Sequence, residues 1–360
     1  MKPKLILING RFMSQPITGV QRYAREVISA LVKSGDTQFK FIIAIPVRNA
    51  FEPIPDTEIF RDNSSLPTSI WQQVRLPFLM KKLRADFLWS PCNIGPVFTE
   101  NHVITMHDAA TFAGPEWFSL SFRMYYRLIF PLLGQRAKRV LTSSLFSKEE
   151  IVSYDIADAD KIRVIPGGVS SKFTHTTSKI FDFPYILTLG SRDPRKNSAR
   201  LIESWNQLPA DVKKKRRLVI AGREIHSFSS EGYGKIPDDV QFTGYMADND
   251  LPALYSSADA FVFPSLYEGF GLPPLEAMAC GCPVIVSKTA SLPEVCGDAA
   301  YFIDPYSTES ITEGINKVLT DDTLRQSLCD KGLERIKLFS WEKSAEEHIR
   351  NFEELTDVRQ

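Results

Sequence analysis

Two carboxylates stand at a spacing that suits a long polar ligand. Seven residues separate Glu268 from Glu276 in the stretch PSLYEGFGLPPLEAMACGCPVIVS, which covers residues 264–287. Glu268 shares a loop with Gly269 and Gly271, and glycine lets backbone amides approach a ligand closely. Glu276 is expected in the first turn of the helix that follows, where free N–H groups attract phosphate. A carboxylate there can accept hydrogen bonds from ribose hydroxyls. We therefore hypothesise that the pair binds the two ends of one nucleotide-sugar; the alternative is a helix-dipole partner and a solvated loop charge.

Three cations form a second candidate cluster. Arg192, Arg195 and Lys196 occur in the stretch LGSRDPRKN, directly after a short apolar run that predicts a strand. Fixed cations at such a position lower the barrier of a reaction in which a diphosphate leaves with growing negative charge. The alternative is a solvated basic turn.

Two D-x-D triplets are candidate metal ligands, but neither has a favourable context. They are Asp158-Ala159-Asp160 and Asp248-Asn249-Asp250. The first lies in a polar turn, and the second lies where a helix N-cap is expected. Because the basic cluster already supplies positive charge, we predict that the protein uses no metal.

The candidate residues lie at the ends of apolar segments that alternate with segments of helical periodicity. This alternation predicts βαβ units and parallel sheets. The pattern runs twice, interrupted by the polar stretch SSKFTHTTSKIFDFP. We predict an α/β fold of two tandem Rossmann-like, doubly wound domains, over residues 1–172 and 183–340. The last helical segment, 341–360, fits either domain and can pack back on the first.

Two details of the helices are predicted from local chemistry. The helical segment LSFRMYYRLIFPLLGQRAKRV contains Pro131, which lacks an N–H and predicts a break. Ser147 and Glu150 have the spacing of a capping box for a helix that ends at Ser153.

Composition indicates a globular protein. The chain has 360 residues, of which 43% are hydrophobic and 24% charged. Its formal net charge of zero argues against general nucleic-acid binding. Residues 1–170 nevertheless hold 21 Lys and Arg against 15 Asp and Glu, whereas the whole chain holds 43 of each. This basic first half favours an anionic partner such as a membrane surface or a phosphorylated acceptor, with ordinary surface variation as the alternative.

Cysteine usage and apolar runs point to a cytoplasmic location. The five cysteines are odd in number and lack the spacing of a disulfide framework. No signal peptide is visible, and no apolar run reaches the length needed to span a bilayer. We expect a cytoplasmic protein that can work at the inner face of the membrane.

Residues 241–305 resemble the donor-binding signature of the retaining GT-B glycosyltransferases of family 4 (glycosyl transferases group 1). The resemblance rests on FTGYMADNDLPALYSSADAFVFPSLYEGFGLPPLEAMACGCPVIVS and the residues that follow, and on shorter stretches such as GVQRYAREV and MHDAATF. It implies two Rossmann-like domains facing a cleft, a nucleotide-sugar bound by the second, an acceptor bound by the first, and metal-independent transfer with retention. Alternatives are a phosphorylase or epimerase of the same fold, or a non-catalytic sugar-nucleotide-binding subunit.

The resemblance also assigns roles residue by residue. The catalytic assignments are Glu268, His107, Lys196 and Arg192. The donor-binding assignments are Gly19, Gly190, Ser191, Arg195, Gly269, Phe270, Gly271, Leu272 and Glu276. Ser191 departs from the family, which has an arginine directly after the glycine, so whether Arg192 or Arg195 binds the diphosphate stays open.

Substrate identity is indicated only by similarity to bacterial surface-polysaccharide enzymes. The stretches PRKN and MHD resemble mannosyl- and rhamnosyltransferases of that group. We therefore expect a GDP-sugar donor, GDP-mannose first, and a glycan or lipid-linked glycan acceptor. The basic, apolar segment SFRMYYRLIFPLLGQRAKR is a candidate for contact with an anionic membrane, with an ordinary packed helix as the alternative.

Overall fold

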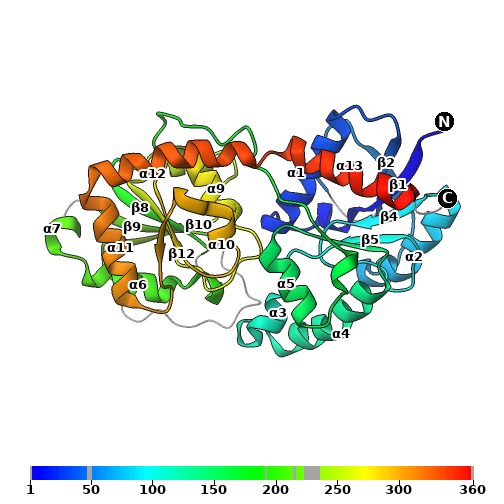
Figure 1. The fold of residues 1–360 in the computed structure, drawn as a ribbon, viewed down its shortest axis with the longest axis horizontal. Helices are drawn as coiled ribbons and strands as arrows, with labels where there is room; N and C mark the ends of the chain where they lie inside the picture. The colour runs from blue at the N-terminus through cyan, green and yellow to red at the C-terminus, as the bar shows by residue number, and fades with distance from the viewer. Residues whose placement is uncertain (1, 47–50, 191–192, 214–215, 223–235, 358–360) are drawn as a thin grey trace. The chain divides into compact units, whose positions relative to one another are not determined.

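The computed structural model describes residues 2–46, 51–190, 193–213, 216–222 and 236–357 (Figure 1). Its contacts divide the chain into two compact units. The first unit comprises Met1–Phe112, Met124–Gly168 and Trp341–Gln360. The second comprises Ala113–Arg123 and Val169–Ser340. The chain therefore changes unit four times, and a short segment from its first half belongs to the second unit.

The first unit is built on a parallel sheet of seven strands in the order β3-β2-β1-β4-β5-β6-β7. The strands are β1 Lys4–Asn9, β2 Phe39–Pro46, β3 Glu58–Asp62, β4 Phe87–Ser90, β5 His102–Thr105, β6 Arg139–Thr142 and β7 Ile162–Val164. The strand order reverses between β1 and β4, where crossovers leave in opposite directions.

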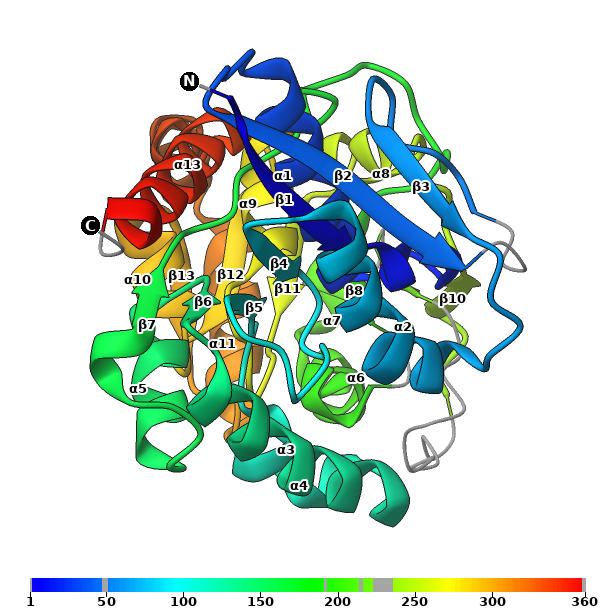
Figure 2. The same ribbon diagram turned by 90° about the vertical axis from the view of Figure 1, so that its right-hand side faces the viewer.

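Helices cover both faces of this sheet. They are α1 Gly19–Lys33, α2 Thr68–Leu83, α3 Ala110–Ala113, α4 Leu120–Arg136, α5 Leu145–Ser153 and α13 Trp341–Asp357. Helix α13 packs beside α1, where Tyr23 Oη lies 3.3 Å from His348 Nε2 (Figures 1 and 2). The buried ring of Phe352 contacts those of Phe39, Phe87 and Trp89 in the sheet. The last helix, for which the sequence fitted either domain, thus belongs to the first unit.

Two details of the helices differ from the sequence predictions. Helix α4 runs unbroken through Pro131, because Phe130 and Leu133 on either side of the proline are buried against the sheet and hold the helix in place. Helix α5 begins two residues before Ser147, and its N-cap is Ser144, whose Oγ accepts a hydrogen bond from the Ser147 amide. The predicted capping box at Ser147 and Glu150 is therefore wrong, although the helix does end at Ser153.

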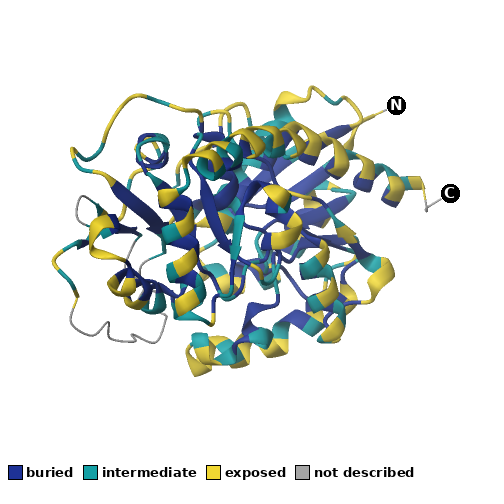
Figure 3. Cartoon of the chain, turned by 60° about the vertical axis from the view of Figure 1, so that its left-hand side comes forward, coloured by how far each residue is buried: buried dark blue, intermediate teal, exposed yellow. Residues whose placement is uncertain are grey.

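The second unit is built on a parallel sheet of six strands in the order β10-β9-β8-β11-β12-β13. The strands are β8 Tyr185–Leu189, β9 Arg217–Ala221, β10 Val240–Gly244, β11 Ala260–Phe263, β12 Val284–Ser287 and β13 Tyr301–Ile303. The central strands are buried on both faces, which explains their continuous aliphatic and aromatic runs. Figure 3 shows the same contrast throughout the protein, with buried strands and helices that expose their outer sides.

Helices also cover both faces of the six-stranded sheet. They are α6 Ser198–Gln207, α7 Ala210–Lys213, α8 Leu251–Ser256, α9 Leu272–Ala279, α10 Leu292–Cys296, α11 Thr308–Thr320 and α12 Asp322–Arg335. Helices α8, α9 and α10 contribute to one buried cluster, and α6, α7, α11 and α12 to another. Each unit is thus a doubly wound α/β sandwich, as the alternation of segments predicted.

Candidate functional site

The strand order of the second unit determines where its ligand site lies. Strands β8 and β11 are neighbours, but the chain leaves them in opposite directions, towards β9 and towards β12. Ligands of open parallel sheets bind at such a reversal, outside the carboxyl ends of the strands. The loops after β8 and β11 carry the basic cluster and the glycine loop of the sequence analysis. The topology therefore brings the two candidate clusters to one place.

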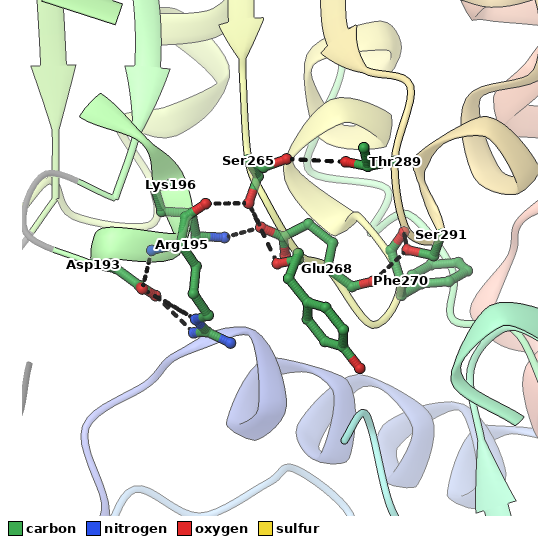
Figure 4. Close-up of polar contacts among 9 residues, drawn as sticks. Asp193, Arg195, Lys196, Ser265, Glu268, Phe270, Thr289 and Ser291 are labelled. Carbon is green, nitrogen blue, oxygen red and sulfur yellow. Dashed lines mark hydrogen bonds and ion pairs between the residues drawn. The ribbon is translucent and has the colours of Figure 1, made fainter. Parts of the chain in front are cut away.

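An ion pair joins the two clusters. Lys196 Nζ lies 2.6 Å from Glu268 Oε1, and the two side chains are only 17% and 14% exposed (Figure 4). Lys196 Nζ also lies 4.5 Å from the centroid of the Phe263 ring, at the end of β11. An ammonium and a carboxylate held together at the carboxyl end of a parallel sheet can serve the anionic and the hydroxyl-bearing parts of one ligand.

Hydrogen bonds hold the two loops against each other. The carbonyl of Arg195 accepts from the Leu266 amide at 2.7 Å. The side-chain amide of Asn197 donates to the carbonyls of Pro264 and Pro305, at 3.1 and 2.7 Å. Asn197 has a left-handed backbone, with φ of 59°, which ends the short turn at Pro194–Lys196 and starts α6. The position of Lys196 is thus fixed from both sides.

Hydroxyl groups fix the glycine loop. The Ser265 hydroxyl lies 2.5 Å from Glu268 Oε1 and 3.0 Å from the Arg195 carbonyl, so its single hydrogen can be donated to either. The Ser291 hydroxyl lies 2.9 Å from the Glu268 carbonyl and 2.7 Å from that of Phe270 (Figure 4). These serines were not singled out from the sequence, because isolated serines are too common to carry a signal without the fold.

Two glycines have conformations that their positions require. Gly190 has φ of +101°, and a Cβ placed there would lie 2.5 Å from Lys196 Cγ. Gly271 has φ of +117°, and a Cβ there would lie 3.0 Å from Leu292 Cδ2. Both glycines therefore admit a close approach that a larger residue would prevent. Ser191 and Arg192, also assigned to this loop, lie outside the described residues.

Arg195 is engaged by a neighbouring carboxylate. Its Nε and Nη2 donate to both oxygens of Asp193, at distances of 2.6 to 3.2 Å. Burial by itself raises the pKa of Asp193, but the charges of Arg195 and Lys196 outweigh burial and hold that pKa below its usual value. Asp193 is thus ionised and tied to Arg195, a partner that the sequence analysis did not identify.

Glu276 does not lie in the first turn of its helix, so that prediction is wrong. Helix α9 begins at Leu272, directly after Gly271, which makes Glu276 its fifth residue. The side chain is buried, and Glu276 Oε2 accepts a hydrogen bond of 3.1 Å from the Tyr255 hydroxyl. A helix-dipole role is correspondingly weaker, since the dipole acts mainly within the first turn.

His107 lies in the first unit, after β5. Its Nε2 donates to the Pro91 carbonyl at 2.9 Å, its amide donates to Asn93 Oδ1, and its carbonyl accepts from the Ser147 hydroxyl. The Tyr23 ring packs against the imidazole with a centroid distance of 4.7 Å. Burial lowers the pKa of His107, so the ring is neutral at pH 7.

Gly19, the other candidate in the first unit, is the first residue of α1. Thr18 is the N-cap, and its side chain and that of Gln21 form a capping box. A Cβ at Gly19 would meet no atom within 4 Å. The local structure does not itself require glycine here.

Two of the four D-x-D aspartates form ion pairs with lysine, and a third lies at a helix N-cap. Asp248 forms an ion pair of 3.2 Å with Lys172, and Asp250 is the N-cap residue of α8. Asp158 pairs with Lys161 at 3.3 Å. Across the part of the chain that the structure describes, no three His, Cys, Asp or Glu side chains gather in a way that could hold a metal ion.

Solved structures show which fold this is. The chain superposes on sucrose-phosphate synthase from Thermosynechococcus elongatus with a TM-score of 0.78, over 99% of this chain and 100% of that one, at 20% identity. It superposes on WaaG, a glycosyltransferase involved in lipopolysaccharide biosynthesis, with a TM-score of 0.72, over 96% and 98% of the two chains, at 16% identity. The fold is therefore GT-B, with two Rossmann-like domains, as the sequence predicted.

Sequence comparisons identify the family. Residues 173–335 match the family described as glycosyl transferases group 1, and residues 17–173 match glycosyltransferase family 4. Together the two matches span most of the chain. The protein belongs to the group 1, family 4 glycosyltransferases.

Curated relatives agree with this assignment. The O-antigen chain mannosyltransferase B of Escherichia coli is 29% identical, over 93% of this chain and 95% of its own length. The serotype-specific mannosyltransferase WbdA of Escherichia coli is 33% identical over 63% of this chain, which spans only 30% of WbdA. The O-antigen chain mannosyltransferase RfbU of Salmonella typhimurium is 32% identical over 61% of each chain.

Proposed function

We propose that this glycosyltransferase moves mannose from GDP-mannose to a saccharide or lipid-linked saccharide of a bacterial surface polysaccharide, with retention of configuration and without a metal. The observation that carries the proposal is the Lys196–Glu268 ion pair at the reversal of strand order between β8 and β11. The choice of mannose rests on the three relatives, whose names state O-antigen or serotype-specific mannosyl transfer.

The ion pair suggests how the donor is held. A diphosphate attracts the Lys196 ammonium, and sugar hydroxyls donate to the Glu268 carboxylate, so donor binding exchanges one internal ion pair for two contacts with the ligand. Ser265 keeps Glu268 in place when Lys196 turns away, because its hydroxyl lies 2.5 Å from Glu268 Oε1. Lys196 then stabilises the negative charge that develops on the leaving diphosphate.

The glycine loop and α9 supply the remaining donor contacts in this proposal. The backbone amides after Glu268, at Gly269, Phe270, Gly271 and Leu272, face the diphosphate, and Glu276 binds the ribose. Since Glu276 is buried and accepts a hydrogen bond from the Tyr255 hydroxyl, its contact with the ribose requires a change of rotamer or a further hydrogen bond donated to its carboxylate by a ribose hydroxyl. Lys196 makes a metal unnecessary for neutralising the diphosphate.

The first unit supplies the acceptor side in this proposal. His107 is neutral and held by three hydrogen bonds, which suits a rigid contact with the transferred sugar. Gly19 stays a proposed donor-binding residue, because it is the first residue of α1 and backbone amides at a helix start attract phosphate. The incoming acceptor hydroxyl loses its proton to the leaving phosphate oxygen, so no protein base is assigned.

A transfer assay tests the proposal. The protein is incubated in EDTA with GDP-mannose and a mannose-terminated, lipid-linked oligosaccharide, and both GDP release and the anomeric configuration of the product are measured. We expect an α-mannosyl product, the configuration of the donor. A β-mannosyl product would contradict retention, and donor binding with neither transfer nor hydrolysis would favour a non-catalytic sugar-nucleotide binder.

A basic and apolar surface of the first unit supports contact with an anionic membrane. Helix α4 exposes Met124, Leu128 and Leu132, spaced four residues apart and therefore aligned along one side. Helix α2 exposes Ile70, Val74 and Phe78 in the same way. Neither helix contains an acidic residue, whereas both contain lysine or arginine. Apolar side chains flanked by cations suit the headgroup region of an anionic bilayer.

Vesicle flotation tests this membrane contact. We expect the protein to float with phosphatidylglycerol vesicles at low salt and not with phosphatidylcholine vesicles, and Leu128→Glu to weaken the binding. Equal recovery with both vesicle types, or none with either, would exclude the contact while leaving the transferase proposal intact. No helix among the described residues is long and apolar enough to cross a membrane.

A further inference from the structure

Arg195 stands beside the donor site, yet its surroundings differ from those of a ligand-binding cation. Its guanidinium donates from Nε and Nη2 to both oxygens of Asp193, the shortest distance being 2.6 Å. The Asp193 side chain is only 7% exposed, and that of Arg195 20%. Such a forked, sheltered pair is broken only with a large loss of hydrogen bonding, because each ion would be left partly buried and alone.

An aromatic ring covers the same guanidinium. Arg195 Cζ lies 5.5 Å from the centroid of the Phe118 ring. Phe118 belongs to Ala113–Arg123, the segment from the first half of the chain that is part of the second unit. From the same segment, Trp117 contacts the ring of Tyr267, the neighbour of Glu268, at a centroid distance of 5.9 Å. The segment thus supports both loops that carry the ion pair.

The backbone of Arg195 connects these loops directly. Its carbonyl accepts from the Leu266 amide at 2.7 Å and lies 3.0 Å from the Ser265 hydroxyl. Its amide donates to Asp193 Oδ1 at 3.0 Å. Lys196, the next residue, therefore extends from a backbone that is fixed by Asp193 on one side and by the loop after β11 on the other.

We propose that Arg195 is a positioning residue, held by Asp193 and Phe118, that fixes the Lys196 ammonium beside Glu268, and that it is not itself a ligand of the donor diphosphate. The inference rests on the proposed function, because it concerns the role of Lys196 towards a diphosphate. This proposal replaces the expectation that Arg195 binds the donor. Among the basic-cluster residues that the structure describes, it leaves Lys196 as the cation that contacts the leaving diphosphate.

Asp193 variants separate the two roles of Arg195. Asp193→Asn removes the charge that holds Arg195 but keeps the arginine, whereas Arg195→Ala removes the arginine itself. If Arg195 is a positioning residue, both variants lose a similar factor in kcat, about 100-fold for a displaced catalytic group. If Arg195 binds the diphosphate, Asp193→Asn frees it and retains activity while Arg195→Ala does not, which would overturn the proposal.

A double-mutant cycle shows whether Arg195 acts through Lys196. The Kd values of GDP and GMP are measured by calorimetry for Arg195→Ala, Lys196→Ala and the double variant, with Arg217→Ala as a matched control at the opposite end of the sheet. We expect Arg195→Ala to reduce the preference for GDP over GMP in the native background and to change nothing further once Lys196 is removed. If the fold-losses in GDP preference of the two single variants multiply in the double variant, Arg195 and Lys196 bind the diphosphate independently, and the proposal is contradicted.

Two further comparisons keep the test decisive. Arg195→Lys should not restore activity, because an ammonium cannot form the fork with Asp193; full rescue would contradict the positioning role. A lower melting temperature with an unchanged GDP preference would reduce Arg195 to a structural residue and overturn the proposal. Failure of the native protein to bind GDP or UDP would instead count against the proposed function itself.

Discussion

At the scale of single residues, the candidate site depends on the ion pair between Lys196 and Glu268, whose two side chains have different proposed roles. The charges of Lys196 and Glu268 neutralise each other, with Lys196 Nζ 2.6 Å from Glu268 Oε1. Because both side chains are largely buried, removing one partner would leave the other charge unpaired, which is energetically costly. We propose that a diphosphate and a sugar hydroxyl group replace that mutual contact when a nucleotide-sugar binds.

Substitution of either partner should reduce turnover far more than stability. We expect Lys196→Ala and Glu268→Gln each to lower kcat by about 100-fold to 1,000-fold, as removal of one preorganised electrostatic group does in other enzymes. GDP release from GDP-mannose and melting temperature are measured together. Lys288→Ala is the control, since Lys288 forms a more exposed ion pair with Asp304 in the same unit. Turnover at the native rate in either variant would refute the site.

Two glycines should respond differently to alanine. Gly271→Ala forces a Cβ into a backbone of φ +117° beside Leu292, and we expect a loss of roughly 1–3 kcal/mol. Gly19→Ala has room for its Cβ, so stability should be retained. A weaker donor Kd in Gly19→Ala at unchanged melting temperature would support its contact with the donor phosphates; an unchanged Kd would leave Gly19 a helix-start residue only.

The sequence indicates Lys196 and Glu268 as candidate site residues, but it does not predict which residues surround them. Lys196 and Glu268 were identified from chemistry and resemblance, but they are 72 residues apart, and only the order of β8 and β11 brings them into contact. Glu276 was placed one turn too early, because the left-handed Gly271 that precedes the helix has no clear signature in sequence. The sequence analysis did not identify Asp193, because a single carboxylate within a basic cluster only lowers the net positive charge of that cluster and does not indicate which residue it binds.

At the scale of elements, buried strands and helices with clear periodicity were predictable, whereas the edge strand β3 was not. Short, continuous apolar runs such as those of β1, β8 and β11 predict strands that are buried on both faces at the centre of a sheet. β3 lies at the sheet edge, reads EIFRD and is partly exposed, so it lacked that signal. The break expected at Pro131 did not occur, because packing against the sheet outweighs one missing hydrogen bond.

Helix α13 should be essential to the first unit. Phe352 is fully buried against three aromatic rings of the sheet, and we expect Phe352→Ala to destabilise the unit by about 3–5 kcal/mol. Hydrogen exchange of peptides from β1 and β2 reports this loss, with peptides from β8 and β9 as the internal control. Equal acceleration in both sets, or in neither, would show that α13 does not act on the first unit alone.

The contact between α13 and α1 should also make the first unit sensitive to acid. Burial lowers the pKa of His348 to about 4, well below its ordinary value, so the unfolded state binds the proton first. Stability should therefore fall as pH drops below about 6.5, by roughly 2 kcal/mol at pH 5 from this residue. His348→Gln should reduce that dependence in urea unfolding monitored by exchange of β1, but not abolish it, because burial also lowers the pKa of His102 to about 3 and that of His107 in the same unit. An unchanged pH slope would assign the effect to other groups.

At the scale of the whole molecule, two doubly wound units divide the chain, and their boundaries are not simple. The predicted division into 1–172 and 183–340 follows the repeat of the βαβ pattern, whereas the contacts also place Ala113–Arg123 in the second unit and Trp341–Gln360 in the first. Periodicity identifies elements but not the unit on which a connecting segment packs. The segment Ala113–Arg123 is important for the candidate site, because its residues Phe118 and Trp117 contact the two loops that carry Lys196 and Glu268.

The central claim, that the second unit forms a metal-independent site for a nucleotide-sugar, is tested most directly by thermal shift. The protein is heated with GDP-mannose, and separately with UDP-, dTDP- and ADP-sugars, in the presence of EDTA. We predict that GDP-mannose raises the melting temperature without added metal, since binding to the native state stabilises it by mass action. A shift that appears only after Mg²⁺ or Mn²⁺ is added, or no shift with any sugar nucleotide, would contradict the account.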